Sequence, residues 1–200
     1  MLFRSVVAQS TAFQNGSFPP VEHIVYTTAT PGDYWIGVQR FRSTRRLQLD
    51  LVVTTDYAME YVVLAESLVV PADSPNALTV GAVVPGTLEV RPYSSQGPTK
   101  DRRIKPDIMG GDQVTTATYG PFGFSGTSAA APHVAGAAAL LKSGKRSASP
   151  AELRLQLAHR VIGPGLGSVN TQIGWGLVHL GQLIGSVYLP IMPKGALVAG

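Results

Sequence analysis

The residues best suited to chemistry lie between Phe124 and Gly136, where the chain reads FSGTSAAAPHVAG. Gly126-Thr127-Ser128 predicts a tight turn that brings the Ser128 hydroxyl to the first turn of an apolar helix. Unpaired N–H groups and the helix dipole favour negative charge there. An oxyanion formed when Ser128 attacks a carbonyl would be held by the Ser128 backbone N–H. The segment therefore predicts a nucleophilic serine.

A helix N-cap without chemistry is the alternative for Ser128, because serine is a favoured capping residue. The longer run decides between the two interpretations. It resembles the active-site serine signature of the subtilase family, GTS-x-A-x-PHVAG, at nearly every position. A match over eleven residues is far more specific than a short motif, so it favours the nucleophile. Pro132 is expected in the first helical turn, where its missing N–H costs little.

Flanking segments extend this resemblance to about residues 67–183. SPNALTVGAV (74–83) is similar to the strand upstream of the family's serine, and YSSQGPT (93–99) and RIKPDI (103–108) are similar to the connectors that follow. NTQIGWGLVHL (170–180) resembles the closing glycine-rich stretch. The resemblance implies an α/β fold, namely the C-terminal portion of a subtilisin-like parallel-sheet domain. It also implies a serine-type endopeptidase that hydrolyses peptide bonds in protein or peptide substrates.

The base and acid that a serine nucleophile needs are not evident. Subtilisins place them before the serine in the order Asp, His, Ser. The only upstream histidine is His23, and no aspartate precedes it. His133 follows Ser128 by five residues, about 140° around a helix, so its ring is not expected to reach the hydroxyl. His133 is expected to be packed and hydrogen-bonded, and His159 and His179 to be structural or exposed.

This chain also departs from the family pattern at other polar groups. Subtilases use an asparagine side chain as a second oxyanion donor, but Asn15 follows no apolar strand and Asn76 suits a turn. Asp107 is structural in the family pattern. Where the family usually has Ala-Pro-Gly, this chain has 109–111 as Met-Gly-Gly, which predicts a looser loop. Calcium is implied as a stabiliser of the intact enzyme, although no acidic ligand cluster of the expected kind is present, so no metal or cofactor residues are assigned.

The expected loss of activity without a catalytic histidine indicates that this chain is a fragment of a larger enzyme. In subtilisin, removing the catalytic histidine lowers turnover by about 10⁶-fold. We therefore expect this chain to be inactive alone, with an N-terminal half of the catalytic domain as its missing partner. Without that half, the apolar helix after Ser128 should have an exposed face. The alternative is a non-catalytic scaffold or binding module derived from a subtilase.

Four stretches follow from patterning. Residues 1–20 form an irregular leader, and 21–66 a β-rich insert with alternating apolar residues. Residues 67–185 form the subtilase-like part, and 186–200 an exposed tail rich in proline, glycine and alanine. Within the third stretch, 77–84 is typical of a buried parallel strand.

Two helices are expected within 67–185. The first opens near Ser128 and ends at about Lys142, before Ser143-Gly144. The second begins after Ser149, which forms a capping box with Glu152. Its apolar residues recur at four-residue spacing and predict one buried stripe; they are Leu153, Leu157 and Val161.

Composition limits the remaining classes. Hydrophobic residues make up 44% and charged residues 14%, which excludes a disordered chain, and no cysteine is present, which excludes disulfides. The net charge of +4 comes largely from two basic clusters, at 40–46 and 100–105, interpreted as solvated loops rather than a nucleic-acid surface. No stretch is apolar for long enough to span a membrane. The resemblance implies an extracellular enzyme, although the N-terminus is a poor signal peptide.

Overall fold

The structure is a computed structural model that describes residues 5–17, 19–40, 42, 44, 46–54, 59–163 and 167–181. Its internal contacts divide the chain into two compact units, Met1–Thr55 and Asp56–Gly200. Backbone hydrogen bonds join Glu66 to Gly97 and Ser67 to Gln96. The end of the predicted 21–66 segment therefore belongs with the second unit. The predicted tail at 186–200 lies outside the described residues.

The first unit differs from the β-rich insert that the alternating pattern predicts for 21–66. Its described residues form neither helix nor strand, and all of those from 19 to 54 are exposed. Large apolar side chains such as Trp35 and Leu49 are more than half exposed. Alternation produces a stable sheet only when one face is covered by other apolar groups. That cover is not found among the described residues of this unit.

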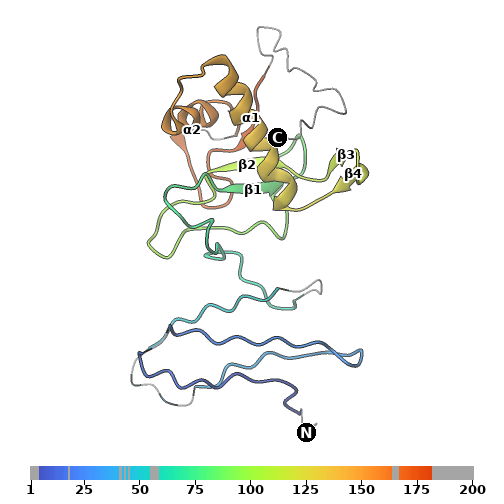
Figure 1. Cartoon of the computed structure of the whole chain (residues 1–200), viewed down its shortest axis with the longest axis vertical. Helices are drawn as coiled ribbons and strands as arrows, with labels where there is room; N and C mark the ends of the chain where they lie inside the picture. Colours follow the sequence, from blue (N-terminus) through green and yellow to red (C-terminus); the bar gives the residue numbers. More distant parts are fainter. Residues whose placement is uncertain are drawn as a thin grey trace, which may run out of the picture. The chain divides into compact units, whose positions relative to one another are not determined.

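A four-stranded sheet in the order β1-β2-β6-β5 forms the centre of the second unit (Figure 1). Strands β1 (Val80–Val83), β2 (Ile108–Gly111) and β6 (Leu177–Val178) run parallel. Strand β5 (Val161–Ile162) pairs with β6 in the antiparallel direction. The predicted parallel-sheet α/β class is confirmed, and the predicted strand within 77–84 is β1.

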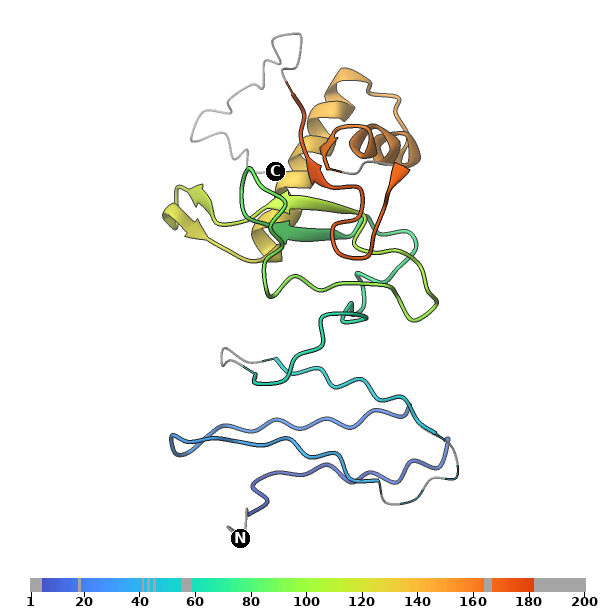
Figure 2. The ribbon, with the colours of Figure 1, turned by 180° about the vertical axis from the view of Figure 1, so that it is seen from behind.

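Two helices complete the unit. Helix α1 (Thr127–Gly144) packs against β1 and β2, and α2 (Pro150–Ala158) packs against α1. The view from behind shows β5 and β6 next to the two helices (Figure 2). The core between sheet and helices is formed by apolar side chains, namely Ile108, Val134, Ala137, Leu141 and Leu157.

The predicted boundaries of the helices agree closely with the structure. Ser149 accepts a hydrogen bond from the Glu152 backbone N–H, and the Glu152 side chain accepts one from the Ser149 N–H, which confirms the capping box. Leu157 is buried, and Leu153 packs against the same core. Val161 also packs there, but from β5, because α2 ends at Ala158.

The outer edge of β1 is covered by the segment that follows it. The Ala82 N–H donates to the Ser94 hydroxyl at 3.0 Å, and the Ala82 carbonyl accepts from the Arg91 N–H at 2.9 Å. The Val84 N–H donates to the Glu89 carbonyl at 2.9 Å. An open strand edge invites pairing with another chain, and these bonds close much of it. They also bring residues 89–94 beside the end of β1.

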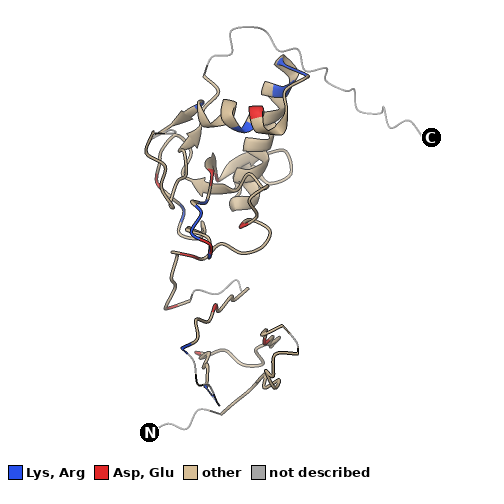
Figure 3. Cartoon of the chain, turned by 90° about the vertical axis from the view of Figure 1, so that its left-hand side faces the viewer, with Lys and Arg blue, Asp and Glu red and all other residues tan. Residues whose placement is uncertain are grey.

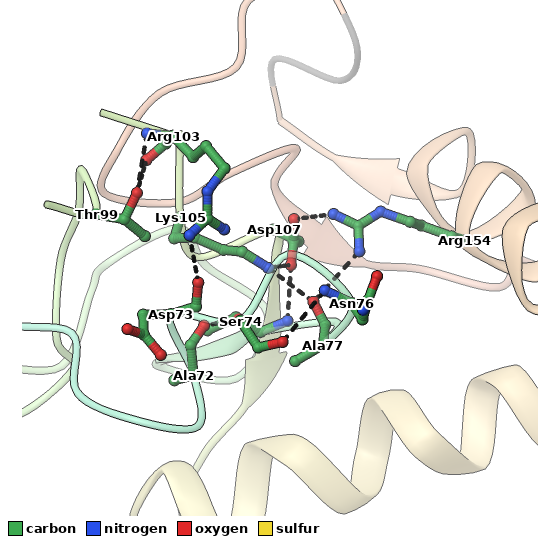
Figure 4. A network of polar contacts seen from close by, with 11 residues as sticks. Ala72, Asp73, Ser74, Asn76, Ala77, Thr99, Arg103, Lys105, Asp107 and Arg154 are labelled. Atoms are coloured by element: carbon green, nitrogen blue, oxygen red, sulfur yellow. Dashed lines mark hydrogen bonds and ion pairs between the residues drawn. The ribbon is translucent and has the colours of Figure 1, made fainter. Parts of the chain in front are cut away.

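A buried network of charged groups fastens the beginning of β2 (Figure 4). The Asp107 carboxylate, only 5% exposed, accepts a hydrogen bond from the Thr79 N–H at 2.7 Å and pairs with Lys105 at 2.6 Å. Arg154 of α2 pairs with the other Asp107 oxygen, and its guanidinium lies 5.3 Å from the centre of the Trp175 ring. The structural role expected of Asp107 agrees with these contacts.

The basic residues at 100–105 form ion pairs, although two of them remain largely exposed to solvent and only Lys105 is buried. Lys100 and Arg102 pair with Glu66, Arg103 pairs with Asp101, and Lys105 is buried against Asp107. Figure 3 shows acidic and basic segments close together in the second unit. The interpretation as solvated loops agrees with the exposure of Lys100 and Arg102, and it was wrong for Lys105, which is buried.

Candidate active site

A β-hairpin leads directly to the predicted nucleophile. Strands β3 (Val114–Thr116) and β4 (Gly120–Phe124) pair antiparallel, and α1 begins three residues after β4. Ser128 is the second residue of α1, and its side chain is exposed. The position agrees with the turn and helix start expected from the sequence.

The turn requires a glycine at its centre. Gly126 caps α1 with φ of 111°, a backbone conformation that residues with a side chain rarely adopt. Its carbonyl accepts from the N–H groups of Ala129, at 2.8 Å, and Ala130, at 3.3 Å. The N–H groups of Thr127 and Ser128 have no partner among the described residues. Their positions suit the binding of an oxyanion.

The close approach of β2 and α1 fixes the height of Ser128 above the sheet. A Cβ added to Gly110 would lie 2.4 Å from the Ala130 carbonyl oxygen, so only glycine fits there. Met109 and Gly110 are buried within β2. The looser loop predicted from Met-Gly-Gly at 109–111 was therefore wrong. These glycines belong to a strand that lets helix α1 pack directly on the sheet.

Asp112 is a site residue that the sequence interpretation missed. It follows β2 directly and is fully buried, and it accepts the Gly126 N–H at 2.6 Å. Tyr93 donates its hydroxyl to the same carboxylate, and Arg91 pairs with it at 2.8 Å. The available signal was an aspartate at the carboxyl end of a buried parallel strand, where sites of open α/β sheets gather.

Opposing influences act on these two acids. Burial, the largest influence, raises the pKa of Asp112, but the hydrogen bonds from Tyr93, Gln113 and Gly126 and the charge of Arg91 bring it below its ordinary value. Burial also raises the pKa of Tyr93, and its bond to Asp112 adds to the rise. Asp112 is therefore ionised at neutral pH and Tyr93 is protonated.

The histidines of the second unit form no described hydrogen bond with the Ser128 hydroxyl. His133 Nδ1 lies 2.8 Å from the Ala129 carbonyl oxygen, so that nitrogen carries the proton and donates. This bond was expected, but the ring is exposed rather than packed. His23, His159 and His179 are exposed, as their interpretations allowed. Ser128 has no hydrogen-bonded base among the described residues.

Two other expectations concern the helix start and the asparagines. Pro132 is the sixth residue of α1, not part of its first turn, because the helix begins at Thr127. The missing N–H of Pro132 leaves the Ser128 carbonyl without its usual helical donor. Asn76 is exposed within a turn, as predicted, and Asn15 is exposed in the first unit, so neither lies in a strand that could aim an oxyanion donor.

The next features are those that would bind a metal or cross a membrane. Within the described ranges, no three His, Asp or Glu side chains lie close enough together to hold a metal ion. The described residues therefore do not fit a calcium site built from acidic side chains. No described helix is long and apolar enough to cross a membrane.

Known proteins resemble this chain in the same region. The sequence profile of the subtilase family matches residues 61–176, which is more than half of the chain. The chain belongs to the subtilase family. Subtilisin-like proteases of fungi are among its relatives. One from Coccidioides posadasii is 39% identical over 102 residues, and subtilisin-like protease 2 of Trichophyton rubrum is 40% identical over 98 residues.

This subtilase chain matches only part of those relatives. The two matches cover 48% and 46% of the chain but 23% and 21% of the relatives' own length. Among solved structures, the CspB protease of Clostridium perfringens shares 26% identity at a TM-score of 0.48, over 58% of this chain and 28% of that one.

Proposed function

We propose that the chain carries the nucleophile segment of a serine endopeptidase that hydrolyses peptide bonds through Ser128. The observation that carries this proposal is the exposed Ser128 at the second position of α1, with its own N–H unpaired among the described residues. Ser128 would attack a peptide carbonyl, and the N–H would bind the oxyanion that forms. Collapse of the oxyanion would break the peptide C–N bond, release the protonated amine and leave an ester on Ser128, which water would then hydrolyse to a carboxylic acid and the free serine.

The same arrangement supports the proposal that catalysis by Ser128 depends on side chains from outside these 200 residues. The serine hydroxyl needs a base, and the three histidines of the second unit are exposed and form no described hydrogen bond with it. We propose that an upstream half of a catalytic domain supplies histidine, aspartate and a second oxyanion donor. The 200-residue chain alone would then be inactive. Secretion, as in an extracellular enzyme acting on protein or peptide substrates, belongs to this proposal.

The exposed face of α1 also supports the proposal that an upstream half completes the domain. The buried face of the helix packs on β1 and β2, while the opposite face exposes small residues, among them Ala131, Ala135 and Ala139. Such residues leave room for another element to approach closely.

The test begins with the protein from its own cells. Its intact mass and N-terminal sequence establish the length of the native chain, and a fluorophosphonate probe then reports whether a serine is activated. We expect a native chain longer than 200 residues and labelling confined to Ser128. Ser128→Ala should abolish labelling, and Ser125→Ala, which alters a neighbouring hydroxyl, should retain it.

The 200-residue chain serves as the comparison. Because it lacks the base, its labelling should be slower by several orders of magnitude. Failure of the native protein to react at Ser128 would contradict the peptidase proposal and favour a non-catalytic scaffold or binding module. Rapid labelling of the 200-residue chain would contradict the proposed need for an upstream base.

A further inference from the structure

We propose that Asp112 is a positioning residue for Ser128, and that its buried carboxylate holds the turn from which the nucleophile helix starts. The inference rests on the proposed function, because it assigns Asp112 a role at the same serine. Asp112 acts through Gly126 and not by contact with a substrate.

The geometry connects the sheet to the nucleophile through one side chain. The Asp112 backbone N–H donates to the Val83 carbonyl at 3.0 Å, which fixes the residue to the end of β1. Its carboxylate accepts the Gly126 N–H at 2.6 Å. Gly126 caps α1, and Ser128 follows two residues later. The position of the turn relative to the sheet is therefore set by a short, charge-assisted hydrogen bond.

The surroundings of the carboxylate keep it charged and immobile. Arg91 and Tyr93, both from the segment that covers the edge of β1, contact its second oxygen. The Arg91 guanidinium also donates to the Gln113 side chain at 2.6 Å. With these partners the pKa of Asp112 stays below its ordinary value. A buried carboxylate without these partners would destabilise the folded state, so Arg91 and Tyr93 are the groups that allow Asp112 to stay ionised here.

The turn needs such an anchor because its centre is intrinsically adaptable. Glycine occupies many backbone conformations, and Gly126 holds one with positive φ. Among the described residues, the Gly126 N–H meets the Asp112 carboxylate and the Tyr93 hydroxyl, which Asp112 itself holds in place. Asp112 therefore selects this conformation both directly and through Tyr93. A misplacement of about 1 Å in a reacting group can lower the rate about 100-fold. Loss of the anchor should therefore lower the reactivity of Ser128 in each folded molecule, beyond any effect on the stability of the fold.

The first measurement requires no catalytic activity. The sequence contains two Ser-Gly pairs, Ser125-Gly126 and Ser143-Gly144. Labelling the 200-residue chain with carbonyl-¹³C serine and ¹⁵N glycine therefore isolates two amide signals. We expect the Gly126 signal to move upfield in Asp112→Ala and, less far, in Asp112→Asn. The Gly144 signal, from the other end of α1, is the internal control.

Acid titration gives a second signature. As pH falls, the Gly126 signal should move with a midpoint below the ordinary aspartate pKa of about 3.9, because the folded protein lowers the pKa of Asp112. Arg91 and Tyr93, the other ionisable groups facing this carboxylate, keep their charge states in that range. In Asp112→Asn the titration should disappear. An unchanged Gly126 signal in both Asp112 variants would overturn the proposal.

The reactivity of Ser128 is measured on the native protein with the fluorophosphonate probe. Asp112→Ala should slow labelling about 10- to 100-fold per folded molecule, and Asp112→Asn, which retains an acceptor for the Gly126 N–H, should restore part of the rate. Asp107→Asn is the matched control, because it alters a buried carboxylate at the other end of β2. Its labelling rate per folded molecule should equal that of the wild type.

The outcomes separate the two proposals. Equal labelling rates for wild type and Asp112→Ala would overturn the positioning role even if Ser128 is the nucleophile. If the wild-type native protein is not labelled, the proposed function fails. In that case the shift and titration of the Gly126 signal still decide whether Asp112 anchors the turn.

Discussion

Two buried aspartates lie at opposite ends of β2 and contact different parts of the fold. Asp107 precedes the strand and joins the 77–79 segment to α2 through Lys105 and Arg154. Asp112 follows the strand and contacts the nucleophile turn. A buried charge is stable only with its partners in place, so each carboxylate fixes the groups around it.

Replacing Asp107 with alanine should strongly destabilise the protein. Lys105 is 2% exposed, and the substitution would leave its ammonium buried without a carboxylate. We expect a loss of about 3–5 kcal/mol in the free energy of unfolding, measured by urea denaturation. Asp101→Ala removes an exposed partner of Arg103 and should have a much smaller effect. Similar losses for the two variants would show that burial does not determine the cost.

Asp112 should also make stability depend on acid. Its pKa is lower in the folded protein than its ordinary value, so the unfolded chain binds the proton first as pH falls. Its contribution is therefore present above the unfolded pKa of about 3.9 and is lost as pH falls through the folded value. The difference in unfolding free energy between wild type and Asp112→Asn should shrink below pH 4. A difference that is constant from pH 7 to 2 would contradict this assignment.

At the scale of elements, close packing between β2 and α1 depends on the smallest side chain. A Cβ at Gly110 would meet the backbone of Ala130, while one at Gly111 would meet nothing within 4 Å. The two neighbouring glycines therefore differ in their tolerance of substitution. The same contact sets where the N-terminal turn of α1, and with it Ser128, sits on the sheet.

Gly110→Ala should force α1 away from the sheet. Overpacking of this kind typically costs about 1–3 kcal/mol, which urea denaturation would detect. Gly111→Ala is the matched control, and its unfolding free energy should stay near that of the wild type. If the two substitutions have equal effects, the close approach of helix and strand is not what requires glycine at 110.

The capping box of α2 should make a measurable contribution. Ser149→Ala removes the acceptor for the Glu152 N–H, and loss of an N-cap costs about 1 kcal/mol. Ser147→Ala, at an exposed serine just before the helix, should leave the midpoint of urea unfolding unchanged. A Ser149 variant as stable as the wild type would mean that tertiary contacts alone hold the helix start.

At the scale of the whole molecule, the two units differ in how far their described residues are buried from solvent. The second has a sheet, two helices and a shared apolar core. In the first, the residues described between 19 and 54 are all exposed. Backbone that is neither buried nor held in a ladder is the preferred substrate of proteases.

Limited trypsin digestion should therefore cut the first unit before the second. The exposed Arg40, Arg42 and Arg46 offer sites there, whereas Arg154 lies within α2 and pairs with the buried Asp107. We expect early cleavage after the three exposed arginines and a resistant product in which the Arg154-Leu155 bond is intact, identified by mass spectrometry. Cleavage after Arg154 at the same rate as after Arg40 would show that the second unit is not the more stable one.

Local sequence patterns were sufficient for several elements and for the candidate nucleophile. The Ser-Pro-Ala-Glu run at 149–152 predicted the α2 cap because both of its hydrogen bonds join residues three apart. The apolar run at 77–84 predicted β1, and the Gly-Thr-Ser turn predicted an exposed Ser128 at the start of a helix. Alternation at 21–66 failed in the described part of the first unit, because strands also need a covering surface that local pattern does not supply.

The sequence by itself determined the family and the residue expected to attack, since both depend on a contiguous run of residues. Only the tertiary structure decided what holds that residue in place. Asp112 meets Gly126 across 14 positions, and Arg91 reaches Asp112 across the edge of β1. The need for glycine at 110 likewise became visible only with Ala130 packed above it. Contacts of this kind depend on how strands and helices meet in space, which no local spacing of residue types encodes.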